Sequence, residues 1–434
     1  MSTYTNAVPG PEDITRRELP NGIVVLVREN FNANSVVITG SVDAGSLFDP
    51  DDTEGLAAFT SASLMRGTLN RDFATIHEML EGNGASLSAS SGIHTAGFSG
   101  KSLAEDLPML LDLLADVLRN PAFPERQVER LRGEFVTGLK IREQDTRYRA
   151  GRAFRELAYP TEHPYRRAAD GTIDSISRIR RQELIDFHRQ HFGPQRMLIA
   201  IVGAVETEEA IHLVDRCFGD WANHTQPAAP ILVDIPVLDS IRTETVVLPG
   251  KSQADLILGL PGPSRFVEDW EAAHLANHVL GVFGMFGRIG REVREKRGMA
   301  YYSFSRLDGG MGPGAWRVAA GVNPANVERT VETILSEIMR ITQELVTPEE
   351  LADSQANITG RLPLQLETNE GVAGSILTME RYKLGMDYLQ RYAERINAIT
   401  AEDVLAAAQR YLRPDGYALA IAGPEVSQNG NEMA

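Results

Sequence analysis

The chain repeats itself once, at a spacing of about 220 residues, and this repeat restricts its fold more than any other feature. The segment HFGPQRMLIAIVG, residues 191–203, matches YLRPDGYALAIAG, residues 411–423. Its proline and final glycine recur 220 positions later, and a similar helical segment precedes each copy, RRQELIDFHRQ and TAEDVLAAAQR. A period of this length is too long for a solenoid unit. The sequence therefore indicates two copies of one domain.

Each half alternates apolar strand segments with long amphipathic helices, and Gly-rich, hairpin-like clusters adjoin the strands. This pattern favours the α+β class over a purely parallel α/β fold. The Pro-rich segment NHTQPAAPILVDIPVLDS has no helical periodicity and is typical of a linker. We therefore predict two homologous domains, each a mostly antiparallel sheet packed with helices: an N-terminal domain over 1–222, a linker over 223–240 and a C-terminal domain over 241–434.

Composition excludes several classes of function. The 434 residues carry a formal net charge of −16, which opposes sequence-independent binding of nucleic acid. The single cysteine, Cys217, allows neither an intrachain disulfide nor a thiolate cage for a metal, and we expect it to be buried. No apolar run approaches the ~20 residues of a membrane span, and the N-terminal segment MSTYTNAVPGPED lacks a signal-peptide pattern. We expect a cytoplasmic protein without membrane association.

Several motifs resemble the M16 family of zinc peptidases, which includes pitrilysin, insulin-degrading enzyme and mitochondrial processing peptidase. They are LPNGIVVLV, DAGSLFDP, GLAAF, RGT, HFGPQRMLIAIVG and, most specifically, LGVFGMFGRIGREVREKRGMAYYSFS. The resemblance covers nearly the whole chain. It implies the short bacterial form of the family, with two similar domains that face each other across a cavity.

The resemblance also implies that the zinc site has been lost. A catalytic member carries two His four apart on one helix, with the general-base Glu between them. The helix around EGLAAFTSASLMRGT keeps the register of that motif. However, the first His position is Ala58, the Glu position is Ser61 and the second His position is Ala62.

The third zinc ligand of the family, a Glu about 77 positions further on, is missing as well. That position falls at Gly138 or Leu139, while the nearby Glu134 and Glu143 are out of register. We therefore expect no cofactor in this chain and no peptide hydrolysis by this half alone.

The second half carries a pair that the family uses for substrate. The resemblance implies an R-x6-Y motif, here Arg294 and Tyr301. A guanidinium can bind a peptide carbonyl and a phenol can donate a hydrogen bond to a developing oxyanion. The alternative is a solvated helix-end Arg and a Tyr ring in the core. The surrounding family motifs favour the functional interpretation, with Tyr301 rather than Tyr302. Arg297 lies too close to Tyr301 to form the pair.

Three other motifs carry alternatives. HLANH, 274–278, has the spacing of a zinc pair, but Asn277 stands where the motif would have its Glu, and we expect helix surface and core. The small-residue segment 83–100 predicts a strand pair, and it fits a simple hairpin as well as an edge that pairs with extended substrate. The Gly-rich segment 307–317 predicts a hairpin turn.

The resemblance implies a zinc-free subunit of a heterodimeric peptidase. A zinc-carrying M16 subunit with an intact H-x-x-E-H helix would be the partner, and short or unfolded peptides would be the substrate. The alternative is an inactive structural or peptide-binding protein like the core subunits of the respiratory bc1 complex, and a homodimer is one form of it. Retention of both Arg294 and Tyr301 favours the first interpretation.

Overall fold

The structure, a computed structural model, describes residues 8–228, 232, 235–282 and 287–425. The chain forms two compact units, and each combines segments from both sequence halves. Unit 1 contains residues 1–139, 168–231 and 361–392, and unit 2 contains residues 140–167, 232–360 and 393–434. These units differ from the halves 1–222 and 241–434, because one segment of each half packs with the sheet of the other half.

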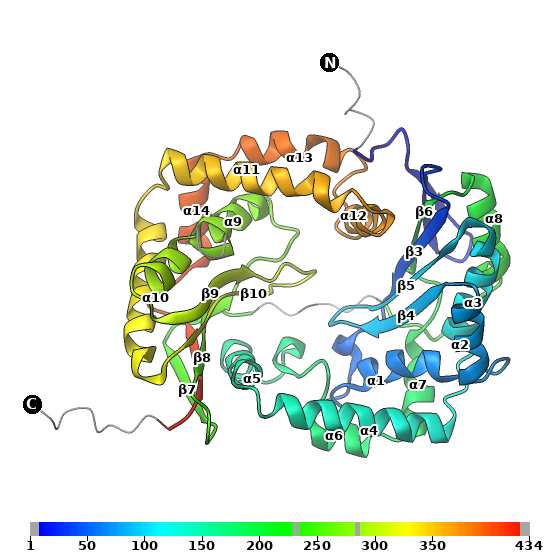
Figure 1. Ribbon diagram of the computed structural model, residues 1–434, viewed down its shortest axis with the longest axis horizontal. Coiled ribbons are helices and arrows are strands. Elements are labelled where there is room, and N and C mark those ends of the chain that lie inside the picture. The colour runs from blue at the N-terminus through cyan, green and yellow to red at the C-terminus, as the bar shows by residue number, and fades with distance from the viewer. Residues whose placement is uncertain (1–7, 229–231, 233–234, 283–286, 426–434) are drawn as a thin grey trace, which may run out of the picture. The chain divides into compact units, whose positions relative to one another are not determined.

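Unit 1 is built on a six-stranded sheet with the order β1-β2-β6-β3-β5-β4 (Figure 1). Its β2 and β6 are parallel, and the remaining neighbours are antiparallel. The strands are β1 (Thr15–Glu18), β2 (Val24–Glu29), β3 (Ser35–Val42), β4 (Ser86–Ser91), β5 (Ala96–Leu103) and β6 (Leu198–Gly203).

Unit 2 is built on a five-stranded sheet with the order β7-β11-β8-β10-β9. Only β7 and β11 are parallel. This order repeats β2-β6-β3-β5-β4 of unit 1, so the duplication and the α+β class are confirmed. The strands are β7 (Arg242–Val247), β8 (Ala254–Pro261), β9 (Ala300–Leu307), β10 (Ala315–Val322) and β11 (Ala418–Gly423).

Helices cover both sheets. Those of unit 1 are α1 (Leu56–Ser63), α2 (Phe73–Gly82), α3 (Leu107–Arg119), α6 (Ile173–Arg178), α7 (Arg181–His191), α8 (Thr207–Phe218) and α12 (Asn369–Arg381). Those of unit 2 are α5 (Thr146–Ala158), α9 (Trp270–Asn277), α10 (Val327–Gln343) and α14 (Ala401–Tyr411). Three helices run from one unit into the other: α4 (Glu125–Arg142), α11 (Pro348–Gln365) and α13 (Tyr388–Asn397).

One helix from each sequence half packs on the sheet of the other. Helix α5 lies on β7, β8 and β11, and α12 lies on β3 and β6 (Figure 1). Both begin at side-chain caps: Asp145 accepts from the Tyr148 N–H, and Thr368 accepts from the Gly371 N–H. Side-chain caps of this kind satisfy amide groups that a helix start leaves open.

The unit 1 sheet is buried on both faces, which explains the continuous apolar run of β2. Val25 and Val27 join the core under α3, α7 and α8, whereas Val24 and Leu26 join the core under α12. Because successive strand residues point to opposite faces, a strand covered on both sides is apolar at every position.

Candidate functional site

Helix α1 holds the positions at which the family motif would carry zinc ligands. The Asp49 carboxylate accepts hydrogen bonds from the Gly55 and Ala57 amides, both at 2.8 Å, and fixes the start of the helix. Ala58 and Ala62 are half-buried and Ser61 is fully buried. The Ser61 hydroxyl has no hydrogen-bond partner among the described residues. None of these side chains matches the imidazole and carboxylate ligands of a zinc site.

The expected third-ligand helix, α4, lies beside α1. The rings of Phe59 and Phe135 are 5.4 Å apart, and Arg66 of the turn after α1 pairs with Glu134 at 2.6 Å. Leu139, at the third-ligand position, is buried in the apolar core. Helices α1 and α4 therefore pack together through aromatic and charged side chains, with an apolar residue at the position expected for the third ligand.

The two carboxylates near the third-ligand position form ion pairs with arginines. Glu134 also pairs with Arg130, and Glu143 pairs with Arg149 and Arg152. Within the part of the chain that the structure describes, no group of three or more His, Cys, Asp or Glu residues could hold a metal ion. The residues around α1 do not fit zinc.

Arg294 and Tyr301 lie in consecutive elements of unit 2. Arg294 lies in a helical turn, Gly290–Glu295, that packs against β9. It is exposed, and it forms no ion pair that involves the described residues. Tyr301, near the start of β9, has 66% of its surface exposed. The alternative interpretation, in which the Tyr301 ring lies in the core, is therefore wrong.

A β-bulge sets the direction of Tyr301. Tyr302 lies opposite Gly321 and Ala300 lies opposite Val322, so Tyr301 is the extra residue of β9. Bulges are frequent next to active sites because they change the direction of a side chain. The bulge separates an exposed Tyr301 from a partly buried Tyr302.

Tyr302 belongs to a polar cluster that ties the exchanged helix α5 to the sheet. Its hydroxyl donates to the carboxylate of Asp255, which is 2% exposed. Thr146 donates to the same carboxylate. Arg147 donates from Nε to the Tyr302 hydroxyl at 2.9 Å, and its guanidinium lies 3.8 Å from the centre of that ring. Burial and the hydrogen bond to Asp255 raise the pKa of Tyr302.

Sequence reasoning missed this cluster. The available signal was Asp255, a single acidic residue in the otherwise apolar strand ADLILGLP. A buried carboxylate needs hydrogen-bond donors, but the sequence does not show that α5, about a hundred residues earlier, supplies them.

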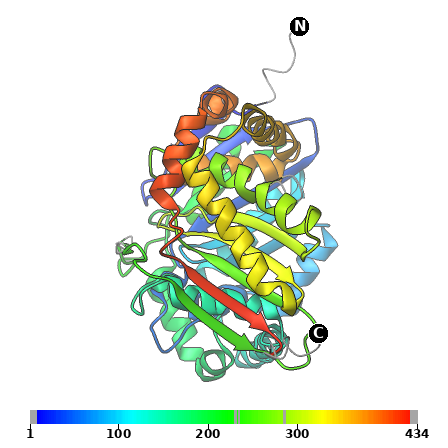
Figure 2. The ribbon, with the colours of Figure 1, turned by 90° about the vertical axis from the view of Figure 1, so that its left-hand side faces the viewer.

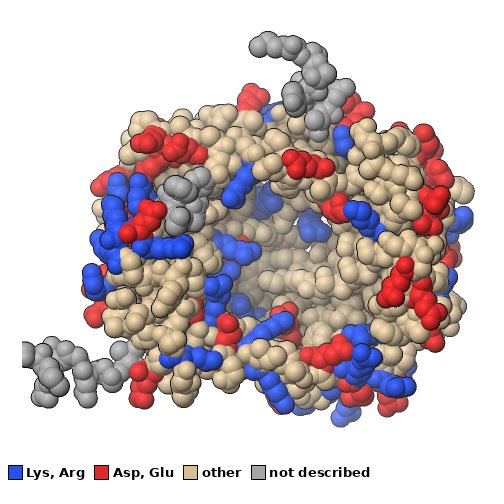
Figure 3. Space-filling view, viewed as in Figure 1, with Lys and Arg blue, Asp and Glu red and all other residues tan. Residues whose placement is uncertain are grey.

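The residues around Arg294 form a basic surface on an acidic protein. Arg291, Arg294, Lys296 and Arg297 are all exposed within seven positions. Figure 3 shows Lys and Arg side chains gathered on the side of unit 2 where α10 lies. Lys296 and Arg297 both pair with Glu292, at 2.6 and 2.9 Å. Among the described residues, the Arg294 guanidinium therefore has no ion-pair partner, whereas the other cations of the cluster are partly neutralised.

The HLANH segment, on α9 and the turn after it, is part of the core. Burial lowers the pKa of His274 to about 4, and its ring stacks on Trp270. Asn277, which directly precedes the second His, accepts a hydrogen bond from Ser305 at 2.6 Å, and His278 contacts the Asn357 side chain at 3.0 Å. The prediction of helix surface and core is confirmed for the core alone, because Leu275–His278 are buried and His274 is half-buried.

The remaining motifs form hairpins. Segment 83–100 contains β4 and β5, and the Gly-rich segment 307–317 links β9 to β10. Cys217 is half-buried, and burial raises the pKa of its thiol. Phe283–Phe286 of the longest family motif lie outside the described residues.

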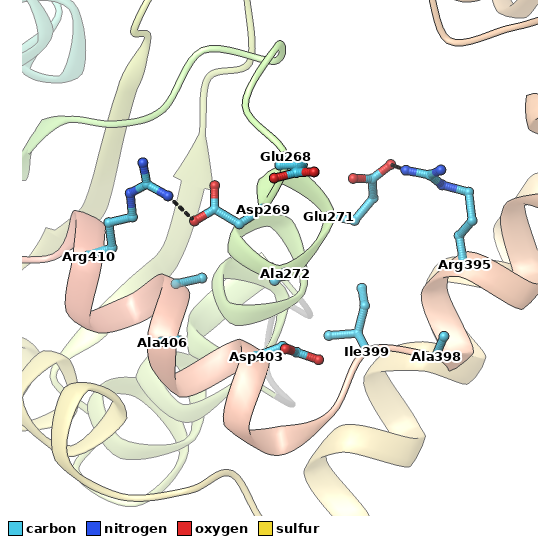
Figure 4. Close-up of a pocket in the computed structure, with 11 residues that line it drawn as sticks. Glu268, Asp269, Glu271, Ala272, Arg395, Ala398, Ile399, Asp403, Ala406 and Arg410 are labelled. Atoms are coloured by element: carbon cyan, nitrogen blue, oxygen red, sulfur yellow. Dashed lines mark hydrogen bonds and ion pairs between the residues drawn. The ribbon is translucent and has the colours of Figure 1, made fainter.

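A separate cavity of about 610 Å³ opens between α9, α13 and α14 of unit 2 (Figure 4). Ion pairs cross it from Glu271 to Arg395 at 2.8 Å and from Asp269 to Arg410 at 3.1 Å. The remaining wall is mostly alanine. The lining also includes the carboxylates of Glu268 and Asp403, and Asp403 accepts hydrogen bonds from the Thr400 N–H and hydroxyl at the start of α14.

Comparisons with known proteins agree with this fold. A family profile described as peptidase M16 inactive domain matches residues 178–358, and one described as insulinase (peptidase family M16) matches residues 24–164. A crystal structure of a peptidase M16 inactive domain from Pseudomonas fluorescens superposes with a TM-score of 0.87 at 26% identity. The superposition covers 96% of this chain and 99% of the Pseudomonas chain.

Two curated relatives match over most of their length. An uncharacterized zinc protease of Mycobacterium leprae is 26% identical over 96% of this chain and 93% of its own. A mitochondrial-processing peptidase subunit beta of Saccharomyces cerevisiae is 24% identical over 93% of this chain and 89% of its own.

The fold defines a duplicated α+β protein, and the helix positions at which the family motif would carry zinc ligands hold alanine and serine. The two family profiles match consecutive segments of this chain and together cover most of it. The chain belongs to peptidase family M16.

Among the described residues, no helix is both long and apolar enough to cross a membrane. The cytoplasmic location stays a prediction.

Proposed function

We propose that this chain is the zinc-free subunit of a heterodimeric M16 peptidase. The bulge at Tyr301 carries the proposal, because it directs an exposed phenol outward from a strand that α5 anchors through the neighbouring Tyr302. Arg294, in the turn packed against the same strand, forms no ion pair with any residue that the structure describes, which supports a role in binding a ligand. A relative that is named as a subunit of a processing peptidase supports assembly with a second chain.

The roles follow from the side chains. The Arg294 guanidinium presents paired N–H donors that bind a carbonyl oxygen of an extended peptide. The Tyr301 hydroxyl donates a hydrogen bond to the oxygen on which negative charge develops. The partner would be an M16 chain with an intact H-x-x-E-H helix, which supplies zinc, water and the general base that Ala58, Ser61 and Ala62 cannot replace. The substrates would be short or unfolded peptides.

The test is a peptidase assay of the purified chain, alone and mixed with a zinc-carrying M16 protein from the same source. We expect activity only in the mixture. Tyr301→Phe should reduce kcat/KM by about 10²-fold or more, the usual loss for one oxyanion donor. Arg294→Ala should reduce it by about 10²-fold as well, because it removes charge-assisted hydrogen bonds to the substrate. Arg297→Ala is the matched control, since Arg297 is also exposed in this basic segment but has the wrong spacing.

Two outcomes would contradict the proposal: no activity in any mixture, or Arg294→Ala and Tyr301→Phe variants as active as the parent. The first would favour the alternative, a structural or peptide-binding M16 protein. The exposed edge strand β4 supports that alternative, since an extended peptide can pair with an open edge. Calorimetric titration of the chain alone with unfolded peptides tests it directly.

A further inference from the structure

The outer edge of β7 is open in the described part of the chain. β7 pairs with β11 on one side, and no described strand pairs with its other side (Figure 2). Arg242, Thr243, Glu244, Thr245 and Val247 are all exposed. An open edge presents unpaired amide and carbonyl groups that can pair with another strand.

The duplicated sheet shows how such an edge is covered. Strand β2 holds the place in unit 1 that β7 holds in unit 2, since each lies parallel to the last strand of its repeat. In unit 1 the additional strand β1 pairs antiparallel with β2, with Arg17 opposite Val25 and Thr15 opposite Val27. The corresponding positions of β7 are Thr243 and Thr245.

The hydrogen bonds of β7 lead to the same conclusion. The Arg242 N–H donates to the Tyr417 carbonyl at 2.9 Å, and the Leu248 N–H donates to the Gly423 carbonyl at 2.7 Å. In a parallel pair these groups alternate along the strand. Even-numbered residues of β7 therefore bond to β11, while Thr243, Thr245 and Val247 direct their amides and carbonyls to the open edge.

We propose that this edge pairs with the β7 edge of a second copy of the chain, as two antiparallel strands about a two-fold axis. A two-fold interface requires a surface that is complementary to itself. β7 meets this requirement: with Thr243 opposite its own copy, Arg242 of each chain lies opposite Glu244 of the other. Both side chains then face the same side of the extended sheet.

Charge selects this register over the alternatives that keep outward peptide groups facing each other. Centring the pair on Glu244 places two carboxylates opposite each other, which is unfavourable. Centring it on Thr245 places each Glu244 opposite Val246 and leaves Arg242 without its partner. The preferred register also brings Ile241, which is 54% exposed, opposite Thr245.

The charges also discourage other partners. An apolar strand would leave Arg242 and Glu244 desolvated without a counter-charge, which costs free energy. The contact is short, so we expect a weak dimer that depends on protein concentration. This inference does not depend on a zinc-carrying partner.

The test is sedimentation equilibrium of the full chain over a concentration series. We expect the average mass to rise toward twice that of one chain. Thr243→Pro should abolish association, because it removes an outward N–H and leaves the β11 ladder intact. Thr243→Ala, which keeps the N–H, is the matched control and should still associate. Circular dichroism of each variant checks that the fold is retained.

Charge reversal tests the register. Arg242→Glu and Glu244→Arg alone should each weaken association by about tenfold, because like charges then face each other. The double variant Arg242→Glu/Glu244→Arg should restore it. A chain that is monomeric at every concentration, a Thr243→Pro variant that still dimerises, or a double variant that stays as weak as the single ones would overturn the proposal.

Discussion

Adjacent tyrosines at the bulge of β9 should separate stability from activity. Tyr302 donates to the buried Asp255 carboxylate and accepts from Arg147, whereas Tyr301 is exposed. We predict that Tyr302→Phe destabilises unit 2 while Tyr301→Phe does not. Each substitution removes one hydroxyl and retains the ring, so the pair is matched in chemistry.

The expected loss of unfolding free energy follows from the hydrogen-bond donors that Asp255 would keep in the Tyr302→Phe variant. A hydrogen bond to a charged group contributes about 1.5–3 kcal/mol, and Asp255 would retain Thr146 and Gln253 as its side-chain donors among the described residues. We expect a loss of about 2–3 kcal/mol, since the contact between the Arg147 guanidinium and the ring persists. For a unit of this size that corresponds to a decrease in Tm of about 4–12 °C. Tyr301→Phe should stay within about 0.5 kcal/mol of the parent.

The assay is urea unfolding of the purified chain, followed by circular dichroism and by tryptophan fluorescence. Two units can unfold in separate transitions, so the midpoint that reports unit 2 is the one to compare. Equal stability of the two variants would refute the role assigned to the Asp255 cluster. A destabilised Tyr301→Phe variant would show that the Tyr301 hydroxyl has an internal partner, which contradicts an outward-directed phenol.

Two further predictions concern unit 1. Burial lowers the pKa of His191 to about 4, so the unfolded chain binds its proton first and stability should fall as the pH decreases from about 6.5 to 4. His191→Phe keeps a ring between Phe48 and Phe187 and should reduce this loss of stability, measured as the change in the free energy of unfolding by urea at pH 7, 6, 5 and 4. The same dependence on pH in the variant and the parent would contradict the role assigned to His191. The parent chain should bind no stoichiometric zinc by plasma mass spectrometry after dialysis. Ala58→His/Ala62→His/Leu139→Glu, which places two imidazoles four apart on α1 and a carboxylate at the third-ligand position of α4, should retain zinc; zinc bound equally by both chains would show that the metal lies elsewhere.

The sequence was sufficient to predict the duplication, the α+β class and the family. The reason is that strand periodicity and turn residues repeat at one offset in both halves, so each half supports the interpretation of the other. It also placed Ala58, Ser61 and Ala62 on one helix, because their spacing is local.

Two features could not be predicted because they depend on distant segments. The amphipathic pattern of α5 and α12 shows that each has an apolar face, but not which sheet that face covers, so the division at 222–241 differs from the compact units. The outward direction of Tyr301 depends on an extra residue in β9. A bulge can be recognised only when the register of β9 with β10 is known. Strict alternation along a strand assigns Tyr301 and Tyr302 to opposite faces, but it does not show which of the two rings is exposed.

In zinc-binding members of the family a metal would link the two helices that correspond to α1 and α4, so the contacts that join these helices here have to be identified. In this chain the contact between α1 and α4 consists of the Phe59 and Phe135 rings, the Arg132 guanidinium 5.2 Å from the centre of the Phe59 ring, and the ion pair of Arg66 with Glu134. Arg132 and Arg66 are mostly buried, so these contacts are partly shielded from solvent. Aromatic pairs and partly desolvated cation–π contacts each contribute about 0.5–2 kcal/mol. Together they can hold α1 against α4 without a metal, which explains how the fold persists although its ligand positions are alanine, serine and leucine.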